Sequence, residues 1–290
     1  MPETTQQINT LLSSIESLRE AKVIRALPGG PASDSFQLQI GDQHFVARVD
    51  RPAARALGLD RHAETAILQL VSEAGIGPQL FWADPDRGIQ VCSYIEGSSW
   101  TLQDLGDPRR LRQLALTLRR LHQLPPVGRA FEPAAAAQRY AAEIGTATAK
   151  LMAESTLELI ANLDLEFSRP ALCHNDLVYS NIIGQGPVTL IDWEYAAVGD
   201  PFFDLAIVLR HHQLSKTLTE VFLRAYAERW APWQFARLEA FCELYDHLAA
   251  LWYLAMVRQD ATGSSFDSDL ERVMLRMSEP GLTIYFEQNL

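Results

Sequence analysis

The sequence predicts an α+β protein with two lobes, a small antiparallel β-sheet lobe over residues 1–96 and a larger, mostly helical lobe over residues 97–290. Strand-like alternation of apolar and polar residues is concentrated in the first lobe, and helical periodicity dominates the second. Alternation with a period of two is typical of a half-buried strand, and apolar residues three and four positions apart are typical of an amphipathic helix. The change of pattern therefore predicts a hinge at residues 93–97.

The first lobe is expected to begin with a helix over residues 3–20, where apolar residues form one stripe. Two alternating runs, 36–40 and 44–49, flank Gly41-Asp42 and predict a hairpin. The other elements expected in this lobe are strands and a helix at 23–27, 79–82, 89–95 and 61–73. Together these elements predict a five-stranded antiparallel sheet.

The second lobe is expected to be helical apart from one short β-like section. The helical segments are 107–123, 134–162 and the region from 203 to the C-terminus. The β-like segments are 171–174, 182–183 and 188–191. No internal repeat and no long linker separates these elements, so the second lobe is expected to form one unit.

Composition narrows the class of protein. Three cysteines without a CxxC pair argue against a disulfide scaffold and fit a reducing cytoplasm. The first twenty residues lack a signal-peptide pattern, and the longest apolar stretch, 248–257, is too short to span a membrane. A net charge of −11 without a basic run argues against nucleic acid as a partner. We therefore expect a cytoplasmic monomer or homodimer that acts on a small molecule, and its acidic surface either attracts a cation or only serves solubility.

The motif that carries chemistry is His174-x-Asp176 followed by Asn181 and, eleven residues later, Asp192 after the apolar pair Leu190-Ile191. Phosphoryl transfer needs one carboxylate that orients the attacking hydroxyl and accepts its proton, and an amide and a second carboxylate that hold Mg²⁺. Mg²⁺ prefers such hard oxygen ligands. The motif predicts Asp176 as the catalytic residue and Asn181 and Asp192 as metal ligands. The alternative is a capped loop in which these residues serve turns.

This segment resembles the aminoglycoside phosphotransferase and choline kinase superfamily, the small-molecule relatives of protein kinases. It looks closest to bacterial choline, ethanolamine or thiamine kinase-like proteins. Residues 190–196 are similar to the metal-binding signature of that family, 199–206 to the motif that follows it, and 121–125 to a further signature. The resemblance covers residues 22 to 260. It implies a protein-kinase-like two-lobed fold, ATP and Mg²⁺ as cofactors, and transfer of phosphate to a hydroxyl group.

In the first lobe, the resemblance implies that a cation on the third strand holds the α- and β-phosphates. Arg48 lies in a strand of the right type, and Glu64 in the next helix matches its partner, since a buried cation needs one. The alternative is a solubilising charge on an edge strand. Gly29, Gly30 and Ser33 would form the phosphate loop, where consecutive amides make an anion site. An ordinary hairpin loop fits these three residues equally well.

The resemblance also implies an adenine site at the hinge, formed by the backbone of Ser93, Tyr94 and Ile95. A simple strand-to-helix turn is the alternative there. Asp204 would brace the catalytic loop by accepting backbone amide bonds, or it would only cap its helix. His174 is expected to be structural.

The acceptor pocket is predicted to use Glu194, Tyr195, Asp246 and Trp252. Aromatic walls beside a carboxylate suit an ammonium group, although aromatic residues at helical spacing also serve as plain core. This sequence departs from the choline kinase pattern, because Ala249 stands where a second tryptophan is usual and His211 stands near an acidic position. Choline, ethanolamine and thiamine therefore all stay open as acceptors.

The leading hypothesis is an ATP-dependent kinase of a small, cationic alcohol. An aminoglycoside or sugar kinase of the same superfamily is the second enzyme hypothesis, and it would require a pocket rich in acidic residues. A nucleotide-binding pseudoenzyme is a third hypothesis, although decayed kinases usually lose one of Asp176, Asn181 and Asp192. A non-catalytic helical adaptor is a fourth, and it would not need a glycine loop, a hinge and a metal pair together.

Overall fold

The computed structural model describes residues 2–30, 32–51, 54, 58–163, 169–184, 187–259 and 266–278. Pro31, which lies inside the predicted phosphate loop, is outside the described residues. The chain forms two compact units, the first made of Met1–Trp100 and Ser180–Ala196 and the second of Thr101–Tyr179 and Ala197–Leu290. The segment 180–196, which follows the predicted boundary by more than eighty residues, thus belongs to the first unit.

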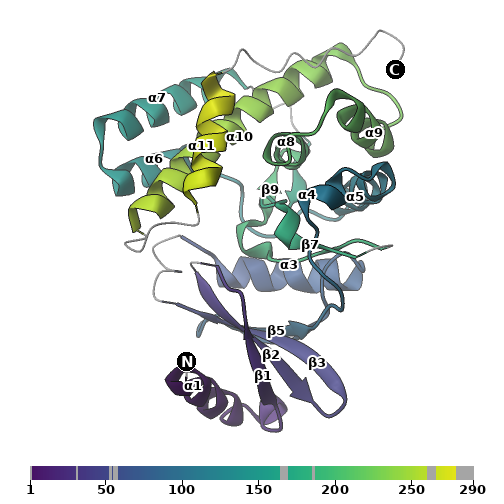
Figure 1. The fold of residues 1–290 in the computed structure, drawn as a ribbon, viewed down its shortest axis with the longest axis vertical. Coiled ribbons are helices and arrows are strands. Elements are labelled where there is room, and N and C mark those ends of the chain that lie inside the picture. Colours follow the sequence, from purple (N-terminus) through teal and green to yellow (C-terminus); the bar gives the residue numbers. More distant parts are fainter. Residues whose placement is uncertain are drawn as a thin grey trace. The chain divides into compact units, whose positions relative to one another are not determined.

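The first unit contains the predicted five-stranded sheet, which is antiparallel throughout and has the order β1-β2-β3-β5-β4 (Figure 1). Its strands are β1 (Lys22–Leu27), β2 (Ser33–Ile40), β3 (Gln43–Asp50), β4 (Leu80–Asp84) and β5 (Ile89–Ser93). β2 and β3 form the predicted hairpin, with Ile40 paired to Gln43 across the Gly41 turn. The left-handed φ of +58° at Gly41 explains the glycine there.

One face of the sheet packs on α1 (Pro2–Ser13) and the short helix η1 (Glu16–Leu18) (Figure 1). Leu12 and Leu18 pack there against sheet residues that include Phe36, Leu38 and Val91. The single helix predicted over residues 3–20 is wrong, because the α-helix ends at Ser13. The hydroxyls of Ser13 and Ser14 hydrogen-bond the carbonyls three residues earlier, which competes with continuation of the helix.

Alternation along β3 sends Phe45 and Ala47 into this core and Arg48 to the opposite face. There, α3 (Arg61–Glu73) packs against η4 (Trp193–Tyr195), which follows the hairpin of β7 (Ile182–Ile183) and β8 (Thr189–Leu190). The bounds of α3 match the prediction. Asp60 caps its first turn by accepting from the N–H of Ala63, and a left-handed glycine, Gly75, follows its end.

The second unit is mostly helical. Its helices are α4 (Leu102–Leu105), α5 (Pro108–Leu121), α6 (Pro133–Ile144), α7 (Ala147–Asn162), α8 (Pro201–His211), α9 (Lys216–Tyr226), α10 (Pro232–Gln259) and α11 (Asp267–Ser278), with η3 at Tyr179–Asn181 on the border between the units. Residues 134–162 are two helices, because Gly145 ends α6 with φ +68° and Thr146 caps α7.

A two-stranded sheet of β6 (Ala171–Cys173) and β9 (Ala197–Gly199) leads to the centre of the second unit. β6 packs against α8, and α8 packs against α10. Ala171, Leu172 and Cys173 are all buried, so the chain enters the predicted catalytic loop from a fixed position. The N-terminus of α8 is fixed as well, since Asp200 caps it and also binds Arg237.

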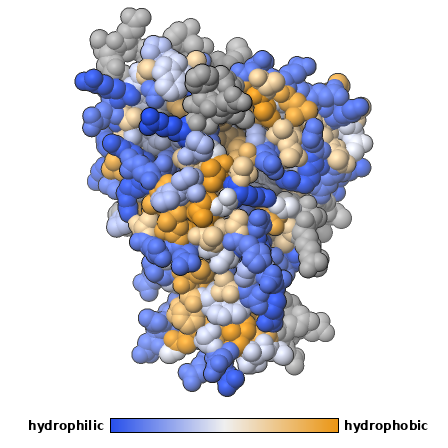
Figure 2. Space-filling model, turned by 180° about the vertical axis from the view of Figure 1, so that it is seen from behind, coloured by the Kyte–Doolittle hydropathy of each residue, from blue (hydrophilic) through white to orange (hydrophobic). Residues whose placement is uncertain are grey.

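The surface is mixed. Polar residues cover most of the face drawn in Figure 2, with hydrophobic residues gathered in smaller areas. The exposed large hydrophobic side chains come from several elements and include Ile24 on β1, Phe81 on β4, Leu151 on α7 and Trp233 on α10. In the part of the chain that the structure describes, no helix has the length and hydropathy required to cross a bilayer.

Candidate active site

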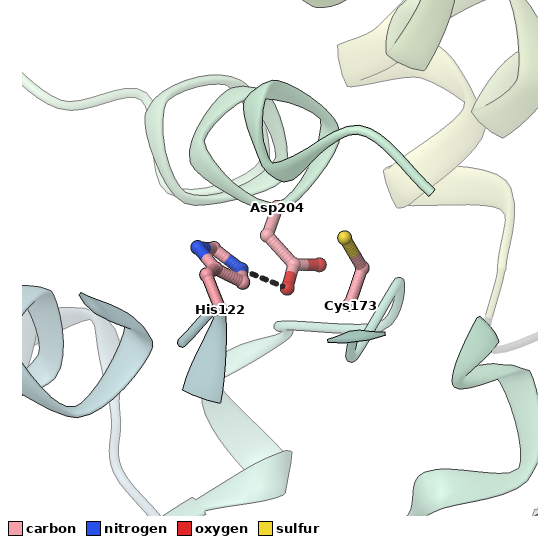
Figure 3. A group of neighbouring side chains, drawn as sticks. All are labelled: His122, Cys173 and Asp204. Carbon is pink, nitrogen blue, oxygen red and sulfur yellow. Dashed lines mark hydrogen bonds and ion pairs between the residues drawn. The ribbon is translucent and has the colours of Figure 1, made fainter. Parts of the chain in front are cut away.

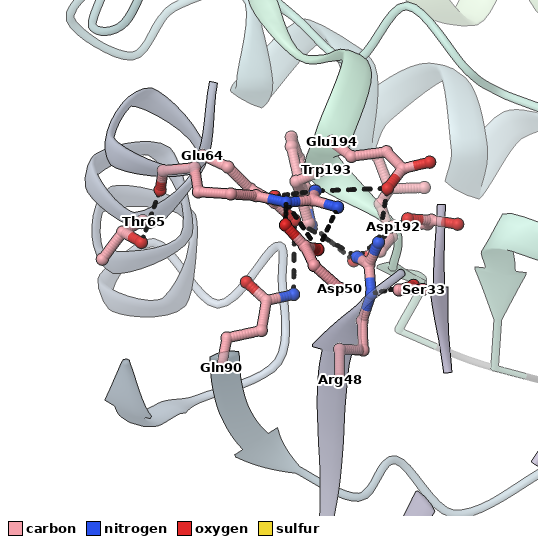
Figure 4. A network of polar contacts seen from close by, with 11 residues as sticks. Ser33, Arg48, Asp50, Glu64, Thr65, Gln90, Asp192, Trp193 and Glu194 are labelled. Atoms are coloured by element: carbon pink, nitrogen blue, oxygen red, sulfur yellow. Dashed lines mark hydrogen bonds and ion pairs between the residues drawn. The ribbon is translucent and has the colours of Figure 1, made fainter. Parts of the chain in front are cut away.

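The first unit contains a partly buried cluster of two arginines and four carboxylates (Figure 4). We call it the Arg48 cluster, and its members are Arg48, Asp50, Arg61, Glu64, Asp192 and Glu194. Arg48 binds Glu64 at 3.2 Å and Glu194 at 2.6 Å. The structure thus joins the predicted phosphate-binding cation to its predicted partner in α3.

Arg61 is the second cation of the cluster. Its Nη1 donates to Glu64 at 2.6 Å and to Glu194 at 3.2 Å, and its Nε and Nη2 hold Asp50. The sequence analysis missed Arg61, although its position three residues before Glu64 in a helix was a signal that the two could pair. Glu64 is only 2% exposed and therefore needs both cations.

The electrostatics of the cluster follow from burial. Burial of Glu194, with the nearby Asp192 carboxylate, raises the pKa of Glu194 to about 7 despite both arginines. Burial also disfavours the charged form of Arg48, but Asp192, Glu64 and Glu194 outweigh it, so the pKa of Arg48 is raised. Four carboxylates against two guanidiniums leave an excess of negative charge, which favours binding of a further cation.

The β7–β8 hairpin positions both predicted metal ligands. Ile182 pairs with Leu190, and the carbonyl of Asn181 accepts from the N–H of Ile191 at 3.0 Å, so Asn181 and Asp192 lie at the same end of the hairpin. Asp192 has a left-handed φ of +67°. Such a backbone costs a non-glycine residue on the order of 1–3 kcal/mol and is typical of functional sites.

Trp193 holds this strained turn in place. Its ring is 1% exposed, and its indole N–H donates to the carbonyl of Leu190 at 3.0 Å. A Cβ added at Gly77 would come within 3.2 Å of the same indole nitrogen, so Gly77 leaves room for the ring.

The ligand set fits Mg²⁺. Oδ1 of Asp192 is buried and has no hydrogen-bond partner among the described residues. It lies 2.9 Å from Nη1 of Arg48, an ion-pair distance without hydrogen-bond geometry. An amide oxygen from Asn181 and a carboxylate with an unsatisfied oxygen are hard ligands of the kind Mg²⁺ takes.

The predicted nucleotide loop and hinge lie at the ends of strands in the first unit. Ser33 begins β2, and its hydroxyl accepts from Nε of Arg48 at 3.3 Å. A Cβ at Gly29 would lie 2.7 Å from the carbonyl of Ser33, so the backbones pass too closely for another residue. The carbonyl of Gly30 accepts from Arg51.

At the hinge, the N–H groups of Ser93 and Tyr94 donate to the carbonyls of Gln79 and His44, respectively. Ile95 follows these two residues beyond the end of β5.

The second unit holds the loop that carries Asp176, and we call residues 174–177 the catalytic loop. Asp204, which is fully buried on α8, accepts from the N–H groups of His174 and Asn175 at 2.8 Å each. This is the bracing contact that the resemblance implied. Nδ1 of the buried His174 accepts from the N–H of Asp176 at 3.3 Å, so His174 also shapes the loop.

His122, Cys173 and Asp204 converge beside this loop (Figure 3). The donor set does not fit a metal. Both ring nitrogens of His122 already have partners: Nε2 donates to Asp204 at 3.0 Å, and Nδ1 lies 2.8 Å from the hydroxyl of Tyr226. The Asp204 carboxylate also accepts hydrogen bonds from two backbone N–H groups. Burial raises the pKa of the Cys173 thiol well above its usual value, which opposes the thiolate that a metal needs. The group is a hydrogen-bonded support for the loop.

The predicted acceptor residues fall into different surroundings. Tyr195 and Glu194 lie in η4 of the first unit, where Glu194 is held by two arginines. Asp246 on α10 is 2% exposed and binds Arg210 and Arg276. Both predicted carboxylates are thus ion-paired with arginines of this chain, although Glu194 shares its two arginines with the other carboxylates of the Arg48 cluster. The sequence analysis did not foresee these pairs because each joins distant elements.

Trp252 on α10 is part of an aromatic group that also includes Phe266, the residue before α11. Its ring contacts Tyr253 and Phe266 edge-on, with centroids 5.0 Å and 5.4 Å away. The hydroxyl of Tyr253 has a pKa raised to about 12 by burial, with the Asp176 carboxylate as the next cause. This shows that Tyr253 lies close enough to Asp176 for the two groups to interact electrostatically.

Known proteins resemble this chain along most of its length. A family model described as the phosphotransferase enzyme family matches residues 23–251. Protein LicA of Haemophilus influenzae is 26% identical over 266 residues, which cover 84% of this chain and 76% of LicA. The crystal structure of choline kinase LicA from Streptococcus pneumoniae superimposes with a TM-score of 0.78 at 21% identity, covering 94% of this chain and 98% of that one.

A second solved structure, LicA in complex with AMP, superimposes with a TM-score of 0.74 at 21% identity, covering 94% of this chain and 96% of that one. These likenesses show that the fold is the protein-kinase-like fold predicted from the sequence, with an antiparallel five-stranded sheet and a helical part.

Proposed function

The chain belongs to the phosphotransferase enzyme family, and from this premise we propose that it transfers the γ-phosphate of ATP to a hydroxyl of a small alcohol of the choline, ethanolamine or thiamine type. The observation that carries the proposal is the Arg48 cluster, in which a buried cation held by Glu64 lies beside an Asp192 oxygen without a hydrogen bond. Phosphoryl transfer depends mainly on positioning and charge stabilisation, and the cluster supplies both.

Nucleotide use is supported by the similarity to LicA in complex with AMP. In this proposal Arg48 binds the α- and β-phosphates. Because its contact with Asp192 lacks hydrogen-bond geometry, a phosphate oxygen can replace that contact while Glu64 keeps the guanidinium in place. The backbone near Gly29, Gly30 and Ser33 would contact phosphate, and the hinge at Ser93, Tyr94 and Ile95 would bind the base.

Asn181 and Asp192 are the proposed Mg²⁺ ligands. Bound Mg²⁺ would neutralise the charge that develops on the phosphate oxygens. Asp176 has a different role on the acceptor: it orients the attacking hydroxyl and accepts its proton as the oxygen–phosphorus bond forms and the γ-phosphate leaves ADP. Asp204 and His174 only position the loop.

The acceptor is proposed to be held mainly by aromatic faces, among them Trp252 and Tyr195. We infer this because Asp246 is held by Arg210 and Arg276, and Glu194 is held by Arg48 and Arg61, so guanidinium groups already occupy both carboxylates. A cation over an aromatic face gains about 0.5–2 kcal/mol, the larger values applying when it is desolvated. This arrangement favours a quaternary or delocalised cation over a strongly hydrated primary ammonium.

The test is an ADP-release assay with purified protein and Mg·ATP against choline, ethanolamine, thiamine, an aminoglycoside and an amino sugar. We expect turnover well above acceptor-free hydrolysis for a choline-type alcohol, with the phosphorylated product identified by mass spectrometry. Phosphorylation of the aminoglycoside or the sugar alone would overturn the acceptor assignment. ADP release that no alcohol stimulates would overturn the kinase assignment.

The metal assignment is tested by thermal melting. Mg·ATP should raise the Tm of the wild type, because a ligand at 100 times its Kd stabilises by about 2.7 kcal/mol. Asp192→Ala should lose this shift, whereas Asp42→Ala, which alters an exposed turn of the same unit, should keep it. An undiminished shift in Asp192→Ala would exclude Asp192 as a ligand.

A further inference from the structure

α8 and the residue that follows it contact the catalytic loop at two points, one on each side of Asp176. On the N-terminal side, Asp204 accepts from the N–H groups of His174 and Asn175. On the C-terminal side, Nε2 of His212, the C-cap residue of α8, lies 2.9 Å from the carbonyl oxygen of Leu177. Asp176 is thus the residue between two attachments to a single helix.

The direction of the His212 hydrogen bond is fixed by its partner. A carbonyl oxygen only accepts, so Nε2 of His212 carries the proton and donates. His212 is 6% exposed, and burial lowers its pKa to about 4, so the ring is neutral near pH 7. In the neutral ring Nδ1 is then an acceptor, and it has no hydrogen-bond partner among the described residues. The ring is therefore held in one tautomer by its bond to the loop.

The loop needs this support because its backbone is unfavourable. Asn175 has a left-handed φ of +62°, a conformation that the surrounding structure must impose on a non-glycine residue. The ring of Tyr179, two residues beyond Leu177, contacts His211 and His212 with centroids 6.0 Å and 6.2 Å away. The C-terminal side of the loop therefore depends on the end of α8 in both its polar and its aromatic contacts.

We propose that His212 is a positioning residue for phosphoryl transfer: its Nε2–H holds the carbonyl of Leu177 and thereby, together with Asp204, fixes the backbone on both sides of Asp176. The sequence analysis gave His212 no role. This inference rests on the proposed function, in which Asp176 orients the acceptor hydroxyl. His212 gives the loop a second attachment in which the hydrogen bond runs in the opposite direction. His212 donates to a carbonyl, whereas Asp204 accepts from two backbone N–H groups.

The test uses two variants that differ in which nitrogen of the imidazole they imitate. The amide nitrogen of Gln reaches the position of Nε2, whereas that of Asn reaches only the position of Nδ1. His212→Gln can therefore keep the bond to Leu177, and His212→Asn cannot. His247→Asn is the matched control, because His247 is a half-buried histidine of the same unit whose Nδ1 bonds Thr156 on α7.

Two readouts are measured. The first readout is steady-state kinetics, which gives kcat and the two KM values. The substrates are Mg·ATP and choline, or whichever alcohol the screen shows to be phosphorylated. A buried acceptor left without its donor costs enough to lower kcat by roughly 5- to 100-fold in His212→Asn. We expect His212→Gln to recover most of kcat, His247→Asn to change little, and the KM for ATP to stay the same throughout. Equal kcat in Gln and Asn, or a loss that appears only in the KM for ATP, would overturn the proposal.

The second readout needs no acceptor and separates this inference from the proposed function. Hydrogen exchange of the peptide containing residues 173–179 should be faster in His212→Asn than in the wild type and in His212→Gln. If no alcohol is phosphorylated but exchange follows this order, the loop contact stands and the kinase proposal fails. If exchange is the same in all three proteins, His212 does not hold the loop, whatever the enzyme phosphorylates.

Discussion

The two units hold their functional residues by different physical means. The Arg48 cluster of the first unit is an ionic network in which two arginines are shared among four carboxylates. In the second unit, the catalytic loop is held by hydrogen bonds between one carboxylate, two imidazoles and backbone groups. The ionic network leaves an excess of negative charge where a metal is proposed to bind, whereas the hydrogen bonds fix geometry around Asp176 without adding a cation beside it.

This difference predicts which property, stability or turnover, a substitution lowers in each region. Removing one charge from a buried ion pair leaves its partner uncompensated, which is costly for stability. Removing one hydrogen bond between a neutral donor and a neutral acceptor, such as His212 and the carbonyl of Leu177, costs less, but it acts directly on the geometry around Asp176, the group proposed to react. Variants of the first unit should therefore mainly lose stability, and variants of the loop should mainly lose kcat.

The largest expected effect is on catalysis, from Asp176→Asn. The amide keeps the shape of the side chain but does not accept a proton from the acceptor hydroxyl. Loss of a general base lowers turnover by roughly 10²–10⁴-fold, while the Tm shift caused by Mg·ATP should remain. Steady-state kinetics and thermal melting measure the two quantities, and near-normal turnover would refute the role of Asp176.

The next effect is on stability, from Arg61→Met. This change leaves Asp50, Glu64 and Glu194 short of one cation, and breaking a buried ion pair costs about 3–5 kcal/mol. Arg51→Met is the matched control, because Arg51 and Asp34 form an exposed pair with side chains 44% and 38% accessible, which is worth about 0–1 kcal/mol. Urea unfolding measures both.

A double variant sharpens this result. Arg61→Met combined with Glu194→Gln also removes one of the negative charges that the loss of Arg61 leaves in excess, so the double variant should recover part of the lost stability. If Arg61→Met costs no more than Arg51→Met, the cluster is not the ionic support described above.

The bounds of α3 were predictable because their determinants are local, whereas the Arg48–Glu64 pair was implied by the resemblance to the family. Asp60 and Gly75 mark the ends of α3 in the sequence itself, and the Gly41-Asp42 turn sets the register that places Arg48. The split of residues 134–162 was also signalled locally, by Gly145 and Thr146, and an Ala-rich composition obscured it.

The contacts that could not be predicted join residues far apart in the sequence. Arg61 meets Glu194 across 133 positions, and His212 meets Leu177 across 35. No periodicity or spacing encodes such pairs, because they depend on how whole elements pack. The neutralisation of Asp246 by Arg210 and Arg276 has the same origin, and it changes the interpretation of the acceptor site.

A smaller effect concerns pH. Burial lowers the pKa of His212 to about 4, below the value of about 6.5 expected in the unfolded chain. The unfolded state therefore binds more protons between these values, so the stabilisation from the neutral ring is complete above pH 6.5 and is lost as the pH falls toward 4.

Relative to a variant that does not titrate, the wild type should lose about 2 kcal/mol between pH 7.5 and pH 5 from this residue. His212→Gln is that variant, and every other titrating group is common to both proteins. Urea unfolding at the two pH values gives the difference. If the difference in the free energy of unfolding between the two proteins does not change with pH, His212 takes up its proton in the folded state at the same pH as in the unfolded chain, and its pKa is not lowered.

The smallest expected effect comes from Tyr226→Phe, which deletes a single oxygen from the support of the catalytic loop. Nε2 of His122 donates to the Asp204 carboxylate, so in the neutral ring Nδ1 accepts from the Tyr226 hydroxyl. Losing that donor leaves one buried nitrogen unsatisfied, a cost of about 1–3 kcal/mol. Because Asp204 keeps its two amide donors, kcat should fall by less than in His212→Asn. Nitrogen-15 NMR of the histidine rings checks the cause: the exposed rings of His44 and His62 should be unchanged, and only His122 should shift. A tenfold or greater fall in kcat with an unchanged His122 spectrum would show that Tyr226 acts on the loop by another route.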